Sequence, residues 1–357
     1  KTMAIQVGVI RGNGIGPEIT EATLHVLEAT GLDFEWVPVP IGDEGMEQYG
    51  HPLPQEAVKI LQRVKLGIKA PLLVDKFKGH LYCEHEDGTV GVYPSLNNAI
   101  RRELGLYVCP RPIRGIPGIS GRYEPLDVHI MREITEDVYS GIEHMIGDDA
   151  AECTKLTTRK AATRVAEYAF DYARKNHRSK VSCVHKANAV SMADGLFLKC
   201  FREVAAKNPD IPSDDFMVDA TAYYLAKCPE KFDVIVAANQ YGDILSDLAA
   251  GLVGSLGLAP GANVGEDGLI VVEASHGAAP DIAGQGIANP IALILSGALL
   301  LRHIGETKLA EYVEQSTIAV LSEKEALTPD LGGTASTMDV ARAIANRVRK
   351  LVEAEKA

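Results

Sequence analysis

Two aspartates, Asp243 and Asp247, stand four residues apart in the segment 239–247, Asn-Gln-Tyr-Gly-Asp-Ile-Leu-Ser-Asp. The apolar run 232–238 before this segment predicts a buried parallel strand, and the residues after it continue a helix. On a helix these side chains share one face, so two carboxylates repel each other unless a cation or a proton lies between them. Mg²⁺ takes oxygen ligands and often only one or two protein carboxylates. The spacing is therefore compatible with a metal site, and also with an N-cap aspartate followed by a solvated one.

Three arginines, Arg101, Arg111 and Arg132, lie near short polar turns. A guanidinium pairs with a carboxylate in a bidentate fork, so these residues indicate a ligand rich in carboxylates. Ordinary surface salt bridges explain them equally well. Ser95 is expected to be the N-cap of the helix that carries Arg101.

The elements that must position these residues alternate between strands and helices, which predicts an α/β protein. Strand 5–10 leads through a glycine loop, 12–16, into a helix over 19–27, but the third glycine comes one position early for a dinucleotide fingerprint. Residues 74–94 are expected to form a solvated hairpin or lid. Because His80, Glu84, His85 and Glu86 in that segment show no fixed helical spacing, a metal site there is less favoured.

The composition is that of an ordinary globular protein of one large or two interleaved domains, with 357 residues, 46% hydrophobic and 24% charged. A net charge of −12 argues against nucleic acid as the main partner. We expect no membrane span, because no run of about 18 apolar residues occurs, and the start of the sequence has no signal-peptide pattern. Six scattered cysteines without a C-x-x-C pair favour reduced thiols and a cytoplasmic location.

Six ordered motifs resemble those of the β-decarboxylating dehydrogenases, the isocitrate and isopropylmalate dehydrogenase family, from Gly12 to about Asp339. They are Gly-x-Gly-Ile-Gly-Pro-Glu at 12–18, Ser-x-Asn-x-x-x-Arg at 95–101, Arg-Glu-x-Thr-Glu-Asp-x-Tyr at 132–139, His-Lys-Ala-Asn at 185–188, Tyr-Gly-Asp-Ile-Leu-Ser-Asp at 241–247 and His-Gly-Ala-Ala-Pro-Asp-Ile at 276–282. The resemblance implies two interleaved α/β domains around a mixed sheet, without a Rossmann fold. Residues 1–98 plus 260–357 would form the large cofactor-binding domain, and residues 99–259 a small domain with the substrate and metal site and the dimer interface.

The resemblance also implies a metal-bound, malate-type anionic substrate in sites shared between the subunits of a homodimer. Asp243 and Asp247 of one subunit and Asp219 of the other would bind Mg²⁺ or Mn²⁺. Lys186, from the partner, would help to move the hydroxyl proton, and Tyr139 would protonate the enol after CO₂ leaves. The substrate itself would be held by Ser95, Asn97, Arg101, Arg111 and Arg132.

For the cofactor, the resemblance implies NAD. NADP-using relatives tend to place a lysine and a tyrosine where this chain has Asp281 and Ile282. An aspartate repels a 2′-phosphate and can accept hydrogen bonds from ribose hydroxyls. Asn289 matches the position that contacts adenine. The cofactor-binding residues would be His276, Gly277, Ala279, Pro280, Asp281, Ile282 and Asn289.

The expected reaction is oxidative decarboxylation of an isocitrate-like (2R,3S)-2-hydroxy acid with NAD, because Ser95 and Asn97 match the pair that holds the γ-carboxylate in isocitrate enzymes. The sequence departs from that pattern at Asn13, Ile134, Ala220, Tyr223-Tyr224, Gln240 and in the long segment 74–94. These departures leave open a malate with another γ-group: homoisocitrate, tartrate or malate, or phosphonomethylmalate. A non-catalytic regulatory subunit is the alternative of another class, and such a subunit should lose Lys186, Tyr139 or the metal aspartates.

Overall fold

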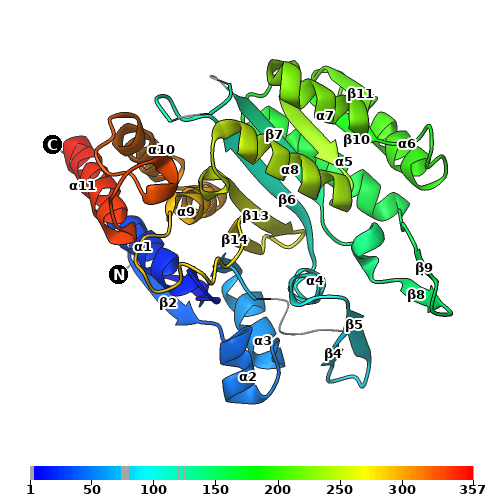
Figure 1. Cartoon of the computed structure of the whole chain (residues 1–357), viewed down its shortest axis with the longest axis horizontal. Coiled ribbons are helices and arrows are strands. Elements are labelled where there is room, and N and C mark those ends of the chain that lie inside the picture. Colours follow the sequence, from blue (N-terminus) through cyan, green and yellow to red (C-terminus); the bar gives the residue numbers. More distant parts are fainter. Residues whose placement is uncertain (1–3, 74–79, 120, 124–125, 357) are drawn as a thin grey trace.

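The computed structural model describes residues 4–73, 80–119, 121–123 and 126–356. One mixed sheet of ten strands runs through this part of the chain, in the order β11-β10-β12-β7-β6-β13-β14-β3-β1-β2 (Figure 1). Its strands are β1 (Ile5–Ile10), β2 (Phe34–Pro38), β3 (Leu66–Lys69), β6 (Leu106–Arg114), β7 (Asp127–Glu133), β10 (Val181–His185), β11 (Ser213–Met217), β12 (Val234–Ala237), β13 (Pro260–Gly265) and β14 (Ile270–Ala274). β6 and β13 run antiparallel to their neighbours, and the other pairings are parallel. The predicted mixed α/β fold is confirmed, while the division of this continuous sheet into two domains stays a prediction.

Helices cover the sheet at both of its ends (Figure 1). They are α1 (Gly16–Glu28), α2 (Asp43–Tyr49), α3 (Gln55–Val64), α4 (Leu96–Glu103), α5 (Arg159–Lys175), α6 (Ala193–Ala205), α7 (Val218–Lys227), α8 (Asn239–Val253), α9 (Ile291–His303), α10 (Thr307–Ser322) and α11 (Thr337–Lys356). α9 is apolar on nearly all sides and packs against β13, β14, α1 and α10. Burial from all directions matches its composition, since an all-round apolar helix belongs in a core.

The strands that lead into the candidate site are parallel, so they present their carboxyl ends at one edge of the sheet. β10, β11, β12 and β7 pair in parallel register, and β12 runs directly into α8. Asp243 and Asp247 therefore lie on a helix, as predicted. The segments that follow these strands carry most of the polar residues discussed below, in keeping with the placement of sites in α/β sheets.

Two hairpins stand apart from the main sheet. β4 (Leu81–Glu84) pairs with β5 (Val90–Tyr93), which confirms a hairpin within the described residues 80–94; residues 74–79 lie outside the described part. The second hairpin joins β8 (Glu143–Ile146) to β9 (Ala150–Cys153), and all residues of both strands are exposed. Figure 1 shows this hairpin projecting from the body of the chain.

The acids and imidazoles of the first hairpin have structural partners. His85 contacts the carboxylate of Glu103 at 2.9 Å and the Thr89 hydroxyl, and Glu86 pairs with Lys59. Among the residues that the structure describes, no group of three or more His, Cys, Asp or Glu side chains could hold a metal ion. In the same residues, every helix is too short or too polar to span a bilayer.

Candidate active site

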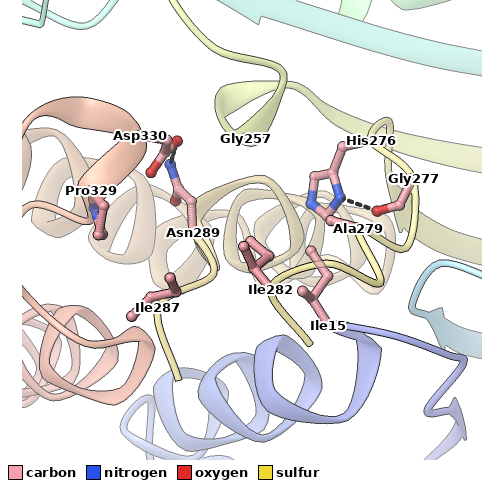
Figure 2. Close-up of a pocket in the computed structure, with 10 residues that line it drawn as sticks. All are labelled: Ile15, Gly257, His276, Gly277, Ala279, Ile282, Ile287, Asn289, Pro329 and Asp330. Atoms are coloured by element: carbon pink, nitrogen blue, oxygen red, sulfur yellow. Dashed lines mark hydrogen bonds between the residues drawn. The ribbon is translucent and has the colours of Figure 1, made fainter. Parts of the chain in front are cut away.

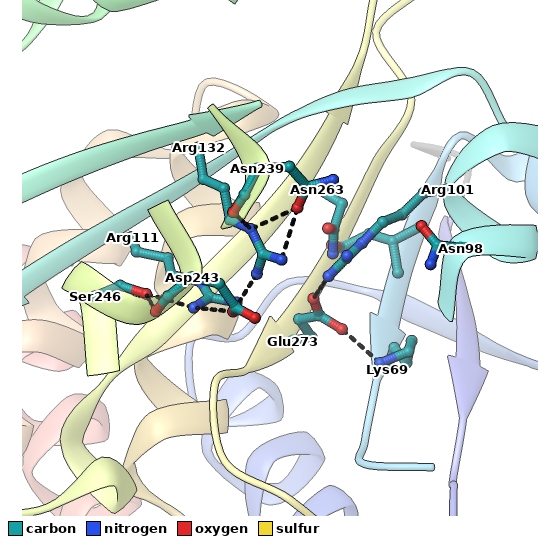
Figure 3. Close-up of polar contacts among 12 residues, drawn as sticks. Lys69, Asn98, Arg101, Arg111, Arg132, Asn239, Asp243, Ser246, Asn263 and Glu273 are labelled. Atoms are coloured by element: carbon teal, nitrogen blue, oxygen red, sulfur yellow. Dashed lines mark hydrogen bonds and ion pairs between the residues drawn. The ribbon is translucent and has the colours of Figure 1, made fainter. Parts of the chain in front are cut away.

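Asp243 lies at the centre of the candidate site, where side chains from three other elements meet it. Figure 3 shows the two arginines among them. Arg132, at the end of β7, forms an ion pair with Asp243 Oδ1. Arg111, on β6, donates from Nη1 to the same oxygen at 3.3 Å. The Tyr139 hydroxyl, in the short 3₁₀ turn Val138–Ser140, lies 3.5 Å from Asp243 Oδ2. Residues that are far apart in the sequence thus meet around one carboxylate.

The two arginines are fixed by further polar contacts. Arg132 donates from Nε and Nη2 to the side-chain oxygen of Asn239, at 3.0 and 2.7 Å. Arg111 donates to the Ser246 hydroxyl at 2.5 Å, and its buried Nε has no hydrogen-bond partner. A β-carbon at Gly242 would come within 2.7 Å of the Arg132 side chain, so the glycine lets α8 approach this arginine closely. Two guanidinium groups held side by side are suited to binding an anion.

Burial and neighbouring charges shift the pKa values of three groups in this site. Burial, together with the charges of Arg111 and Arg101, lowers the pKa of Arg132 to about 9, and the guanidinium still carries its proton at neutral pH. Burial and the charge of Asp243 raise the pKa of Asp247. Burial also raises the pKa of Tyr139, with Asp243 as the next cause, so the phenol is protonated at neutral pH.

Asp243 and Asp247 fit a divalent cation as two of its ligands. Their side chains are 36% and 54% exposed, and Arg111 Nη1 lies 3.7 Å from Asp247 Oδ1. Carboxylate oxygens are the ligands that Mg²⁺ takes, and one or two of them from the protein are enough when substrate and water supply the rest. The donor set is thus compatible with Mg²⁺ or Mn²⁺ at these two residues.

The third predicted metal ligand, Asp219, lies elsewhere and pairs with the predicted catalytic lysine. Lys186 Nζ is 2.8 Å from Asp219 Oδ1, just beyond the carboxyl ends of β10 and β11. The hydrogen bond from Lys186 lowers the pKa of the Asp219 carboxyl. Within the described residues, this pair makes no hydrogen bond or ion pair with Asp243 or Asp247. The chain therefore presents two separate polar groups along one sheet edge.

The remaining predicted substrate residues lie on or at the start of α4. The Ser95 hydroxyl accepts from the backbone N–H of Asn98 at 3.2 Å, which confirms Ser95 as the N-cap. Asn97 has a buried side-chain oxygen without a hydrogen-bond partner. Arg101 Nη2 lies 3.4 Å from Glu273 Oε1, and its charge acts on Arg132. A free acceptor and a guanidinium thus come from the same short helix.

The sequence did not indicate the buried ion pair of Glu273 and Lys69, whose glutamate contacts Arg101. Glu273, on β14, forms an ion pair with Lys69 on the neighbouring β3, and both side chains are less than a tenth exposed (Figure 3). The charges of Lys69 and Arg101 hold the pKa of Glu273 far below its usual range, against the effect of burial. The available signal was a charged residue inside each of two apolar strands, because such residues are rarely buried without a partner.

A second candidate site is a cavity of about 370 Å³ beside the glycine loop (Figure 2). Of the predicted cofactor residues it is lined by His276, Gly277, Ala279, Ile282 and Asn289, while Pro280 and Asp281 belong to the same loop without lining it. The sequence did not indicate the other lining residues, which are Ile15, Gly257, Ile287, Pro329 and Asp330. The only sequence signal for Pro329 and Asp330 was their place in a turn that two glycines follow.

The cavity fits a nucleotide. Three isoleucines provide apolar walls, and Asn289 is fixed by donating to Asp330 Oδ2 at 3.0 Å (Figure 2). His276 Nε2 is buried without a partner, and burial lowers the pKa of this imidazole. Gly14 has φ +59°, and a β-carbon there would come within 2.0 Å of the Ala278 carbonyl oxygen, so the two loops pack closely only with glycine. A largely apolar pocket with a few oriented polar groups is typical of cofactor sites.

Three departures from the isocitrate pattern have structural roles. Ile134 is fully buried in the apolar cluster that includes Ile100 of α4. Asn13 donates to Asp43 at 2.7 Å and accepts from the backbone of Leu73. Gln240 donates its backbone N–H to Asp137 at 2.9 Å.

Comparison with known proteins supports the same family. Residues 6–344 match the family model described as isocitrate/isopropylmalate dehydrogenase. The chain is 43% identical to the Arabidopsis thaliana protein named isocitrate dehydrogenase [NAD] catalytic subunit 5, mitochondrial, over 97% of this chain and 89% of the relative. It is 41% identical to the human isocitrate dehydrogenase [NAD] subunit alpha, mitochondrial, over 97% and 91% of the two chains.

Solved structures agree with this result. Isocitrate dehydrogenase from Methylococcus capsulatus superimposes with a TM-score of 0.88 at 41% identity, covering 97% of this chain and all of that one. Fold and site together define a dehydrogenase of the mixed α/β class. The chain belongs to the isocitrate/isopropylmalate dehydrogenase family, and is a decarboxylating dehydrogenase.

Proposed function

We propose that this chain catalyses the metal-dependent oxidative decarboxylation of isocitrate with NAD, giving a 2-oxo acid, CO₂ and NADH. The observation that carries the proposal is the convergence of Arg111, Arg132 and Tyr139 on Asp243. Arg101 is close enough for its charge to lower the pKa of Arg132. A tricarboxylate matches this set of three guanidinium groups. The plant and human relatives, both named NAD isocitrate dehydrogenase subunits, support the same substrate and cofactor.

In this proposal the arginines bind and orient the substrate carboxylates so that the 2-hydroxyl faces the two aspartates. Asp243 and Asp247 would hold a divalent cation, which supplies Lewis-acid polarisation of the oxygen on C2 when bound. Tyr139 keeps its proton at neutral pH because its pKa is raised, so it can donate that proton to the carbon that loses CO₂. Lys186 would help to move the hydroxyl proton during oxidation.

NAD would bind in the cavity beside the glycine loop and would supply the hydride acceptor of the reaction. Asp281 lies at the edge of that loop, and its carboxylate disfavours a 2′-phosphate. Asn289, which donates a hydrogen bond to Asp330, would meet an adenine edge against the isoleucine walls. The presence of "[NAD]" in the names of the plant and human relatives is in line with this choice.

We further propose that Lys186 and Asp219 act in the site of a second copy of this chain. They pair with each other and make no polar contact with Asp243 or Asp247, within the residues described. A second copy also accounts for the exposed hairpin β8–β9, where Ile142, Met145 and Ile146 are 50%, 62% and 50% exposed. The relatives are named as subunits, which is compatible with a dimeric unit.

Mixed dimers test the sharing of sites. Co-expressed Lys186→Met and Tyr139→Phe chains would form a dimer with one intact site if each site takes Tyr139 from one chain and Lys186 from the other. We expect each homodimer to be nearly inactive and the purified mixed dimer to recover about half of the native activity. An inactive mixed dimer would place both residues in the same chain's site and overturn the proposal.

The substrate is tested by NADH formation with isocitrate, homoisocitrate, isopropylmalate, tartrate, malate and phosphonomethylmalate, each with NAD and NADP and with Mg²⁺ or Mn²⁺. We expect the highest kcat/KM with isocitrate and NAD. Almost no activity with isocitrate, together with turnover of a malate that has another γ-group, would show that isocitrate is not the substrate.

We propose a reducing compartment for the protein, and the cytoplasm is one such compartment. The support is that all six cysteines are free thiols. The plant and human relatives are named mitochondrial, so fractionation of the native host decides between the two locations.

A further inference from the structure

A buried ion-pair network centred on Lys155 lies between the two polar groups of the site. Lys155 Nζ is 2.6 Å from Asp137 Oδ1 and 3.4 Å from Asp194 Oδ1. The three side chains are 14%, 2% and 2% exposed, in that order. The ammonium also lies over the ring of Tyr241, 4.4 Å from its centre. One cation therefore neutralises two carboxylates that are almost fully removed from water.

Asp137 holds the backbone on the Tyr139 and Asp243 side of this network. Its Oδ1 accepts from the N–H of Val138 at 2.8 Å, directly before Tyr139. Its Oδ2 accepts from the N–H of Gln240 at 2.9 Å, in the first turn of the helix that carries Asp243. One carboxylate thus fixes the turn that presents the phenol and the start of the metal-site helix.

Asp194 holds the backbone on the other side. Its Oδ2 accepts from the N–H of Lys186 at 2.6 Å, and its Oδ1 forms the ion pair with Lys155. The Tyr241 hydroxyl also interacts with this carboxylate. Lys155 therefore helps to hold the carboxylate that fixes the backbone of Lys186.

The backbone at Asp137 is strained, which shows how firmly this point is fixed. Asp137 has φ +75° and ψ −156°, a conformation that L residues rarely adopt. Such strain persists only where the surroundings over-determine the conformation, and it concentrates at functional sites. The two N–H donors, Lys155 and the hydrogen bond from the Asp137 N–H to the Leu156 carbonyl all help to hold it there.

We propose that Lys155 is a positioning residue that fixes the Tyr139 turn and Lys186 relative to each other, and thereby links the two active sites of the dimer. This inference rests on the proposed sharing of sites. In such a dimer Tyr139 and Asp243 of one chain serve its own site, while Lys186 of that chain serves the partner's site. A displacement at one site is then transmitted through a single buried network to the other.

The first test uses Lys155→Met in the whole protein, with Lys160→Met as the matched control, since Lys160 is exposed on α5 nearby. We expect kcat with isocitrate to fall about ten- to hundred-fold in Lys155→Met, because small misplacements of reacting groups cost that much. KM for isocitrate should change little, since the arginines are not touched. A merely structural lysine would lower the melting temperature without this selective loss of kcat.

Amide hydrogen exchange gives a readout that is independent of turnover. In Lys155→Met the N–H groups of Val138 and Lys186 should both lose protection, although they lie on opposite sides of the network. Asp194→Asn, a milder change if Lys155→Met folds poorly, should increase exchange at Val138, which Asp194 does not contact. Unchanged exchange at Val138 in both variants would overturn the inference.

Mixed dimers then show whether the link reaches both sites. In the dimer of Lys186→Met and Tyr139→Phe chains, Lys155→Met is added to one chain or to the other. The inference predicts a similar loss of activity in either position, because one intact site uses the Tyr139 turn of the first chain and Lys186 of the second. A loss in only one position, or in neither, would refute the link. If the parent mixed dimer is inactive, site sharing fails, and the exchange results alone decide whether Lys155 positions both segments.

Discussion

Replacing buried Glu273 by glutamine is expected to destabilise the protein strongly, because it leaves two cations without a counter-charge. Glu273 pairs with Lys69 and lies 3.4 Å from Arg101, and their side chains are 9%, 7% and 12% exposed. At an effective dielectric constant of about 20, unit charges at the 3.4 Å separation attract by roughly 5 kcal/mol. Breaking a buried pair by removing one partner costs about 3–5 kcal/mol.

The expected shift in melting temperature follows from the length of the chain. With 357 residues, the entropy of unfolding is roughly 0.7 kcal/mol/K, so Glu273→Gln should lower Tm by about 4–7 °C. Asp267→Asn is the matched control, because Asp267 pairs with Lys65 just before the same two strands while the side chains are 58% and 41% exposed. An exposed pair contributes about 1 kcal/mol or less, so its Tm should fall by no more than about 2 °C.

Calorimetry of the two variants at pH 7.5 distinguishes these values. We expect a clearly larger loss of Tm for Glu273→Gln than for Asp267→Asn. Equal losses would refute it, since they would mean that the buried carboxylate contributes no more than an exposed one.

Three further predictions concern pH, cofactor choice and metal. Burial raises the pKa of Glu133 to about 7. The folded state therefore keeps a proton that the unfolded chain releases above about pH 4.3, and the free energy of unfolding should fall by roughly 3–4 kcal/mol as the pH rises from 4.3 to 7. Urea unfolding should show that this decline is absent from Glu133→Gln. An unchanged pH slope in that variant would contradict the assignment. Asp281→Lys should increase the ratio of kcat/KM with NADP to that with NAD at least about tenfold, equivalent to 1.4 kcal/mol, and a constant ratio would remove Asp281 as a determinant. EDTA should abolish NADH formation and Mg²⁺ or Mn²⁺ should restore it; full activity in EDTA would exclude the proposed role of Asp243 and Asp247.

Local patterns in the sequence were sufficient for the elements and for much of the site. The alternation of strands and helices gave the α/β class, and the apolar run 232–238 followed by a helical pattern placed Asp243 and Asp247 on one helix face. Ser95 was recognised as an N-cap because its residue type and position report a local backbone requirement. Such features depend only on residues that are close together in the sequence, so they can be predicted from it.

Features that depend on strand order could not be predicted. Glu273 and Lys69 are 204 residues apart and meet only because β14 pairs with β3 in the observed register. Asp330 joins Asn289 through the packing of a turn on the cofactor loop. Ile134 likewise joins residues from distant parts of the sequence, such as Ile10 and Val271, in one buried cluster. The sequence contains each of these residues without indicating its partner.

The most direct test of the account is the stoichiometry of the reaction carried out by the purified chain alone. Isocitrate labelled in the β-carboxylate is incubated with NAD and Mg²⁺, and NADH and released CO₂ are measured together. The account predicts equal amounts of both, and loss of both in Asp243→Asn. NADH without CO₂ would contradict decarboxylation, and the absence of both products from the native chain would instead support a non-catalytic regulatory subunit.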